Sequence, residues 1–132
     1  MKQKYFPKFE LAPHFYNNIA LIYMKKEKYQ EALGFLEKGM EKLNTAVNGS
    51  SIQAEKKYED NALMNIMIFN KAIIYEKMAS VSLAIETYKD LISKNPLMTD
   101  SYLRLANIYS NLGNFKAAIK SCDTAQENLH KT

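Results

Sequence analysis

Apolar residues recur every three or four positions along most of this chain, the spacing of one face of an α-helix. The pattern predicts helices at residues 13–26, 29–43, 61–78 and 81–94, followed by two helices that meet at Gly113 and end near Leu129. Pro13 favours a helix start, and Asn95-Pro96 ends the fourth helix. Residues 53–60 are charged but permit helix, so the third helix can begin early. Residues 1–12 are expected to be irregular.

Small residues give these helices a common register. Each predicted helix pair carries two alanines 12 residues apart, and a tyrosine follows the first alanine by three residues. The alanine pairs are Ala20 and Ala32, Ala72 and Ala84, and Ala106 and Ala118; the tyrosines are Tyr23, Tyr75 and Tyr109. The step from Ala72 to Ala106 is 34 residues, and the step from Ala20 to Ala72 is 52, which is 34 plus an insertion of 18.

A 34-residue helix–turn–helix period with this pattern is typical of the tetratricopeptide repeat (TPR). The chain is therefore identified as a member of the TPR family, with an all-α fold that is an α-α superhelix, or solenoid, of three helix–turn–helix units. One TPR domain is predicted at residues 13–132. Its units fall at about 13–46, 65–98 and 99–132, with an insertion at about 47–64 that contains a turn signal at Asn48-Gly49. Glu27 stands where the third unit has Gly113, so the first turn is less favourable.

Composition and motifs indicate a protein without catalytic chemistry. The sequence holds two distant histidines and no P-loop, GxSxG or GxGxxG motif, so no enzyme activity, cofactor or metal is expected. The single cysteine, Cys122, falls at an apolar repeat position and is predicted to be a buried structural thiol. No apolar run reaches the length of about 18 residues that a membrane helix needs.

The charge balance argues against direct recognition of nucleic acid. The net charge is +4, but 17 of the 18 basic residues are lysine and Arg104 is the only arginine. Bidentate contacts with phosphate and guanine favour arginine, so a solvated lysine-rich surface is the simpler interpretation. The expected partners are proteins.

In a TPR stack the first helix of each unit lines a concave groove, where asparagine and arginine side chains can bind the backbone of an extended peptide. The alanine register gives a set of candidate groove residues, with solvated helix faces as the simpler alternative. They are Asn17, Asn18, Leu21 and Met24 in the first unit, Asn70, Ile73 and Lys77 in the second, and Arg104, Asn107, Ser110 and Asn111 in the third.

Chaperone-binding TPR domains hold a C-terminal carboxylate with five polar residues at fixed positions. At these positions the chain has Asn17, Leu21, Asn70, Asp100 and Arg104, and only Asn70 and Arg104 match. Asp100 reverses a charge and Leu21 removes a donor, so a carboxylate clamp of this kind is not expected.

A more specific resemblance lies in three features. These are Pro13 followed by Asn17-Asn18, the long insertion after the first helix pair, and the run from Ile92 through Asn95-Pro96 to Tyr102-Leu103-Arg104-Leu105. In these features the chain resembles the central repeats of the TPR subunits of RNA polymerase II-associated factor (Paf) elongation complexes. The resemblance covers most of residues 13–120. It implies a fragment of a long nuclear scaffold that holds other elongation-complex subunits together.

Two alternatives to this function stay open at the level of sequence. The first is a generic cytoplasmic TPR adaptor that binds an extended peptide in its groove. The second is a regulatory TPR domain of a larger enzyme.

Overall fold

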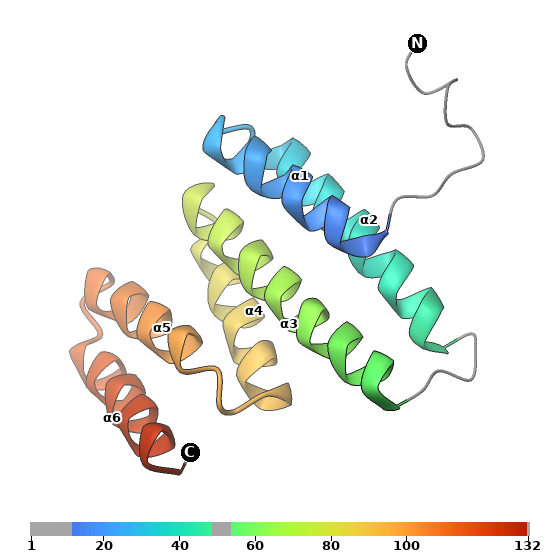
Figure 1. The fold of residues 1–132 in the computed structure, drawn as a ribbon. Coiled ribbons are helices and arrows are strands. Elements are labelled where there is room, and N and C mark those ends of the chain that lie inside the picture. Colours follow the sequence, from blue (N-terminus) through green and yellow to red (C-terminus); the bar gives the residue numbers. More distant parts are fainter. Residues whose placement is uncertain (1–11, 49–53, 132) are drawn as a thin grey trace. The chain divides into compact units, whose positions relative to one another are not determined.

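The computed structural model describes residues 12–48 and 54–131, which form six helices and no strand (Figure 1). The helices are α1 (Pro13–Lys25), α2 (Tyr29–Asn48), α3 (Ala54–Lys77), α4 (Val81–Lys94), α5 (Thr99–Asn111) and α6 (Phe115–Lys131). All six were predicted, and the all-α class is confirmed. The predicted irregular N-terminal segment and most of the predicted turn after Asn48 lie outside the described residues.

The insertion after the first helix pair adds helix at both of its ends. Helix α2 continues five residues past Leu43, where the prediction ended, and α3 begins at Ala54 rather than Asn61. As a result α3 has 24 residues, whereas α1 and α5 have 13 each. The extra turns lack a clear apolar stripe, so hydrophobic periodicity alone placed the start of α3 too late.

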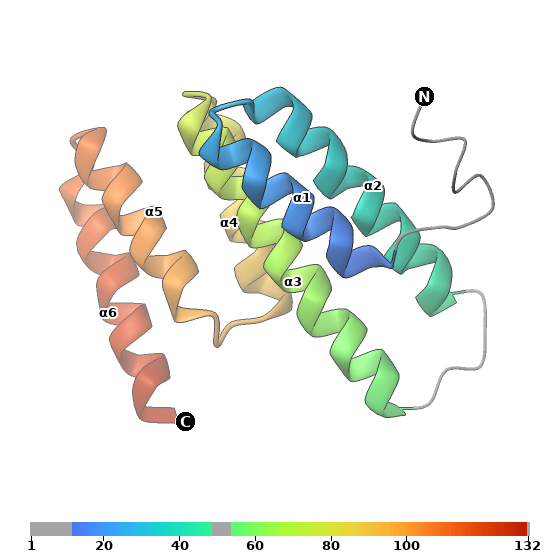
Figure 2. The ribbon, with the colours of Figure 1, turned by 45° about the horizontal axis from the view of Figure 1, so that its top comes forward.

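The chain divides into two compact units, one ending at Asp60 and the other beginning at Asn61. In the first unit α1 and α2 lie side by side (Figures 1 and 2). Their core contains Ala20, Ala32 and Leu36, which are fully buried, together with Tyr16 and Leu43. The two alanines that define the register therefore lie inside the packed helix pair, where only small side chains allow a close approach.

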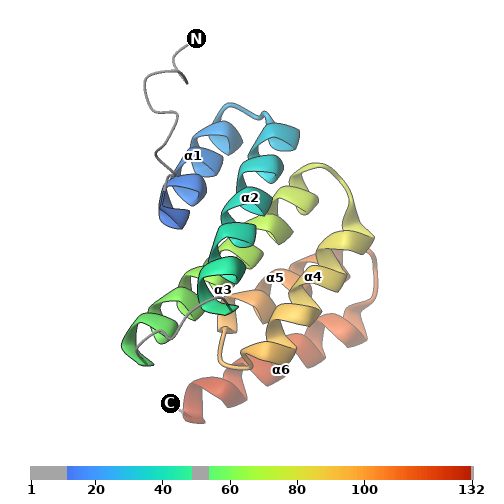
Figure 3. The same ribbon diagram turned by 90° about the vertical axis from the view of Figure 1, so that its right-hand side faces the viewer.

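In the second unit α5 lies against both α4 and α6 (Figure 3). A cluster formed by Ala72, Ala84, Tyr88, Leu105 and Ile108 joins α3, α4 and α5 into one core. Helix α6 is tied back to the loop before α5, because the buried side chain of Asn128 donates a 2.7 Å hydrogen bond to the carbonyl oxygen of Pro96. The core thus fixes α3 and α5 relative to each other, and these are the helices that carry the candidate site.

The turn inside each helix pair has the same backbone geometry in all three copies. Glu27, Ala79 and Gly113 have left-handed φ values of 60°, 62° and 84°. The amides of the next residues, Lys28, Ser80 and Asn114, donate to the carbonyls of the register tyrosines Tyr23, Tyr75 and Tyr109 at 2.8–2.9 Å. This is the Schellman motif, which prefers glycine at the left-handed position. Only the third repeat, with Gly113, meets that preference.

Candidate protein-interaction face

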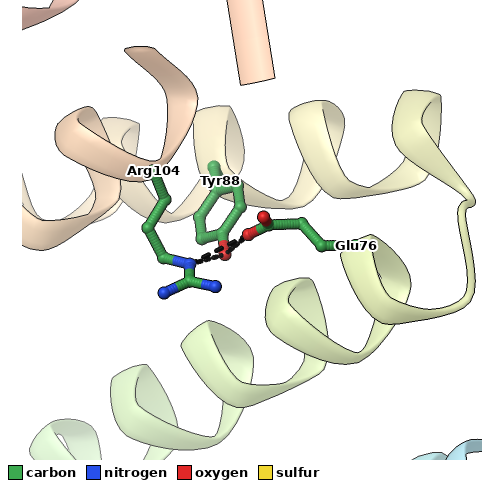
Figure 4. A network of polar contacts seen from close by, with 3 residues as sticks. All are labelled: Glu76, Tyr88 and Arg104. Carbon is green, nitrogen blue, oxygen red and sulfur yellow. Dashed lines mark hydrogen bonds and ion pairs between the residues drawn. The ribbon is translucent and has the colours of Figure 1, made fainter. Parts of the chain in front are cut away.

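Arg104 is the centre of a polar network that joins three helices of the second unit (Figure 4). Its Nε lies 2.9 Å from Oε2 of Glu76 on α3 and 2.9 Å from the hydroxyl oxygen of Tyr88 on α4. The Tyr88 hydroxyl in turn donates to Oε2 of Glu76. One N–H of the guanidinium is thereby shared between a carboxylate and a phenol, and the phenol's proton is committed to the same carboxylate.

Burial and charge decide the protonation states in this network. Tyr88 is fully buried, and burial, followed by its hydrogen bond to Glu76, raises the pKa of Tyr88 far above its usual range. Burial alone would lower the pKa of Arg104, but the hydrogen bond to Glu76 and the charges nearby outweigh it and raise that pKa. Tyr88 therefore remains a neutral donor and Arg104 a cation across the physiological range.

The contacts of Arg104 with Glu76 and Tyr88 run through Nε, and the dashed lines of Figure 4 reach the guanidinium only at this atom. The Arg104 side chain is 36% exposed. A cation held through Nε, with its terminal N–H groups available, is a pre-oriented donor for a carbonyl or carboxylate oxygen.

Arg104 also borders a hollow of about 420 Å³ between α3 and α5. The other residues that line it are Phe69, Asp100, Leu103 and Asn107. The hollow therefore combines two apolar side chains with a cation, an amide and a carboxylate. That mixture suits a polar peptide backbone carrying one apolar side chain.

The predicted groove residues of the second and third repeats lie on the same two helices, α3 and α5. The hollow brings together Arg104 and Asn107. Asn70 and Ile73 on α3 are half-buried, and Lys77 is exposed. Ser110 and Asn111 are exposed on α5 but do not line the hollow. Asn70 already has an interaction of its own within the chain.

The predicted groove residues of the first unit lie on α1. Asn17 is 8% exposed and has a partner within the chain. Asn18 and Leu21 are exposed, and Met24 is half-buried. Asn17 thus has little surface to offer a ligand, whereas Asn18 and Leu21 are accessible. Whether these residues bind a peptide stays a prediction.

Sequence reasoning did not find Glu76 or the polar role of Tyr88. The register contained a signal, because Tyr88 stands where the other units have Leu36 and Cys122. A tyrosine buried at an apolar repeat position needs a partner for its hydroxyl. The prediction that Cys122 is buried was wrong, since the thiol is exposed on α6.

The described ranges, 12–48 and 54–131, hold no group of histidine, cysteine and acidic side chains arranged to bind a metal ion. None of their helices is both long and apolar enough to cross a membrane.

Comparison with known proteins identifies the class to which this fold and face belong. Residues 14–50 and residues 99–128 each match a family model described as tetratricopeptide repeat. The chain belongs to the tetratricopeptide repeat family, as the 34-residue register predicted, and its repeats are those of a protein-interaction scaffold. The predicted TPR solenoid of three helix–turn–helix units is thereby confirmed as the fold class.

One curated relative is similar along most of the chain. RNA polymerase-associated protein CTR9 of Caenorhabditis elegans is 26% identical over 99 residues, which make up 73% of this chain and 9% of that protein. The chain thus spans less than a tenth of the relative's length. The similarity agrees with the resemblance seen in the sequence.

Two solved structures share the fold. A crystal structure of MamA has a TM-score of 0.68 and 19% identity, covering 91% of this chain and 60% of that one. A second structure, MamA MSR-1 C2, has a TM-score of 0.64 and 18% identity, covering 91% of this chain and 59% of that one. At these identities the likeness concerns the fold alone.

Proposed function

We propose that this chain is part of a nuclear scaffold of the Paf type, which holds other proteins together on elongating RNA polymerase II. The observation that carries the proposal is the similarity to CTR9 across 73% of the chain. General repeat pattern explains part of that similarity. The Asn17-Asn18 pair and the run from Tyr102 to Leu105 are features that generic repeats do not require.

The contact chemistry that we propose for the scaffold centres on Arg104. Glu76 and Tyr88 hold its Nε and so order the side chain at the edge of the hollow, which means that its terminal N–H groups lose little further side-chain entropy when a partner binds. A carbonyl or carboxylate oxygen of an extended partner segment accepts from these groups. Phe69 and Leu103 bind an apolar side chain of the same segment. Asp100, on the same face, disfavours a partner with acidic residues at that end.

Affinity purification of the tagged full-length protein from nuclear extract, followed by mass spectrometry, tests the assignment. Polymerase-associated elongation factors are the expected partners, and they should persist after nuclease treatment because no nucleic-acid contact is required. Recovery of only chaperones or cell-cycle ligases would refute the proposal.

A matched pair of variants then tests the site. Arg104→Met keeps the aliphatic stem but removes the cation, and we expect it to weaken recovery of at least one factor about tenfold or more. Lys116→Met, at an exposed position on α6, removes one positive charge elsewhere and should leave recovery unchanged. Equal losses in both variants would show that net charge matters and that the Arg104 hollow does not.

The adaptor alternative is favoured by the same hollow, since its mixed lining also fits a cytoplasmic partner's peptide. The two proposals differ in the identity of the recovered proteins and in the compartment where they are found. The Arg104→Met variant alone does not separate them.

A further inference from the structure

The second unit has another hollow, of about 320 Å³, where α4, α5 and α6 meet. Its apolar lining comes from all three helices and consists of Ile92, Tyr102, Leu105, Tyr109 and Ala117. Its polar lining comes from α4 and α6 and consists of Lys89, Lys120, Ser121 and Thr124. None of the described residues that line it is acidic. We call this site, an apolar surface beside two cations, the lysine hollow.

The lysine hollow and the Arg104 hollow lie on opposite sides of α5. Leu103 and Asn107 line the Arg104 hollow, whereas Leu105 and Tyr109 line the lysine hollow. A step of two residues turns a helix by about 200°, so these two pairs of side chains leave α5 in nearly opposite directions. The two hollows are therefore separate sites.

The repeat register shows that a following repeat leaves this face accessible. The α6 residues that line the lysine hollow correspond, 34 positions earlier, to four residues of α4, which are Leu83, Glu86, Thr87 and Asp90. Leu83, Glu86 and Asp90 are exposed, although the next repeat, α5 and α6, follows them and packs against α4 through α5. The face of α6 that lines the lysine hollow is thus one that a following repeat does not cover.

The two lysines are particular to this copy of the repeat. The counterpart of Lys89 is Glu37, at a step of 52 residues, and the counterpart of Lys120 is Glu86, at a step of 34 residues. Both positions accept an acid elsewhere in the same chain. Packing of the repeat therefore does not require a cation at either place.

Charge complementarity defines the occupant that this hollow fits. Lys89 and Lys120 are both exposed, and two like charges beside one hollow attract an anionic partner. Lysine is a compact point charge that imposes no bidentate geometry, so single carboxylates satisfy it. The apolar lining calls for an apolar side chain, and a hollow of this volume has room for an aromatic ring.

A nucleic acid fits these observations less well. A strand presents a phosphate at every nucleotide and is bound along a groove of many cations. The described lining of the hollow holds two lysines and no arginine. A protein segment with a few carboxylates matches this smaller charge.

We propose that the lysine hollow binds a partner protein segment in which an aromatic side chain is flanked by aspartate or glutamate. The aromatic ring packs on Tyr102, Leu105 and Tyr109, and the carboxylates meet Lys89 and Lys120. This preference is opposite to that of the Arg104 hollow, where Asp100 disfavours acidic residues. The proposal does not depend on the Paf-type assignment, because it concerns a different site.

Fluorescence anisotropy of a short labelled peptide, with one central phenylalanine flanked by glutamates, tests the site. The whole chain should bind this peptide with a Kd below about 1 mM, and binding should weaken as the salt concentration rises. Lys89→Glu and Lys120→Glu should each weaken it about tenfold or more. Lys94→Glu, at an exposed α4 position outside the lining, is the matched control and should bind like the wild type. All three positions are exposed, so circular dichroism should show an unchanged fold.

A charge swap gives the decisive readout. A variant with both Lys89→Glu and Lys120→Glu should lose the glutamate peptide and gain binding of a peptide in which lysines replace the glutamates. Serine in place of the phenylalanine should abolish binding to the wild type. The proposal is overturned by a wild type that binds no peptide up to about 1 mM, by an equal loss in Lys94→Glu, or by indifference to the phenylalanine. Tighter binding of a single-stranded oligonucleotide than of the peptide also overturns it.

Amide chemical shifts then locate the bound peptide. During a titration the largest changes should occur at residues of the lysine hollow, such as Tyr102, Tyr109 and Lys120. The amides of Phe69 and Asn107, which line the Arg104 hollow, should change little. The opposite distribution would show that the peptide occupies the Arg104 hollow and would contradict the proposed site.

Discussion

The left-handed residue of each turn allows a quantitative test of the repeat register. Ala79 is exposed, has a φ of 62° and occupies the place that Gly113 fills in the next unit. A non-glycine residue in the left-handed region costs about 1–2 kcal/mol. Replacing Ala79 with glycine removes that cost but increases the freedom of the unfolded chain, a loss of about 0.4–1 kcal/mol. With mid-range values of about 1.5 and about 0.7 kcal/mol, the net expectation for Ala79→Gly is a stabilisation of about 0.8 kcal/mol.

Urea unfolding followed by circular dichroism at the helix band measures this change. At this chain length a gain of about 0.8 kcal/mol corresponds to a rise in Tm of about 2–4 °C. The denaturant dependence should stay the same, because the substitution changes no buried surface. If the two units unfold in separate transitions, the gain should appear in the transition of the second unit.

Two glycines supply controls of opposite sign. A Cβ added at Gly113 meets no atom within 4 Å, so Gly113→Ala changes only the backbone preference at a φ of 84° and should destabilise by about 1 kcal/mol. A Cβ at Gly34, inside α2, also meets nothing, and Gly34→Ala should stabilise by up to about 1 kcal/mol. If Ala79→Gly destabilised the protein, or both glycine variants shifted stability in the same direction, the turn argument would fail.

Three further perturbations follow from the polar contacts of the second unit. Tyr88→Phe should cost about 1–3 kcal/mol, because it removes a buried donor from Glu76. Burial raises the pKa of Tyr88, so the folded state keeps a proton that the unfolded chain releases near pH 10. The free energy of unfolding of the wild type should therefore fall as the pH rises above about 10. Urea titrations at pH 9 and pH 11 should show a smaller fall of this free energy in Tyr88→Phe than in the wild type. In a double-mutant cycle, Glu76→Gln and Arg104→Met should be coupled by more than about 0.5 kcal/mol, whereas Lys94→Met with Asp90→Asn, an exposed pair at 3.3 Å, should give less than that. Asn128→Ala should cost about 1–2 kcal/mol and speed hydrogen exchange in α6, because it removes the bond to Pro96; an unchanged exchange rate would mean that this bond does not hold the helix.

The sequence was most informative where packing repeats. The alanines at positions 20, 72 and 106 mark where two helices pack closely, and they located the repeat register. The left-handed residues of the three turns, Glu27, Ala79 and Gly113, stand at equivalent positions of this register. The insertion was harder to place. Charged residues at the start of α3 carry no apolar stripe, and helix propensity alone does not say where that helix begins.

The candidate site shows a different limit of sequence reasoning. Arg104 was placed on the α5 face from the register, but its partners come from α3 and α4, at separations of 28 and 16 residues. No local pattern reports such a contact. The exposure of Cys122 was missed for a related reason: burial at a repeat position depends on what packs over it, and the described residues leave that part of α6 open.

Glu76, Tyr88 and Arg104 also give the packing of α5 on α3 and α4 a selectivity for one arrangement of these helices. Arg104 finds its carboxylate and phenol only when α5 packs on α3 and α4 in the observed register. A helix shifted by one turn, or a foreign helix without the arginine, leaves Glu76 without its cation, and burial of an unpaired charge is costly. The charged network thus specifies one pairing of helices inside the second unit.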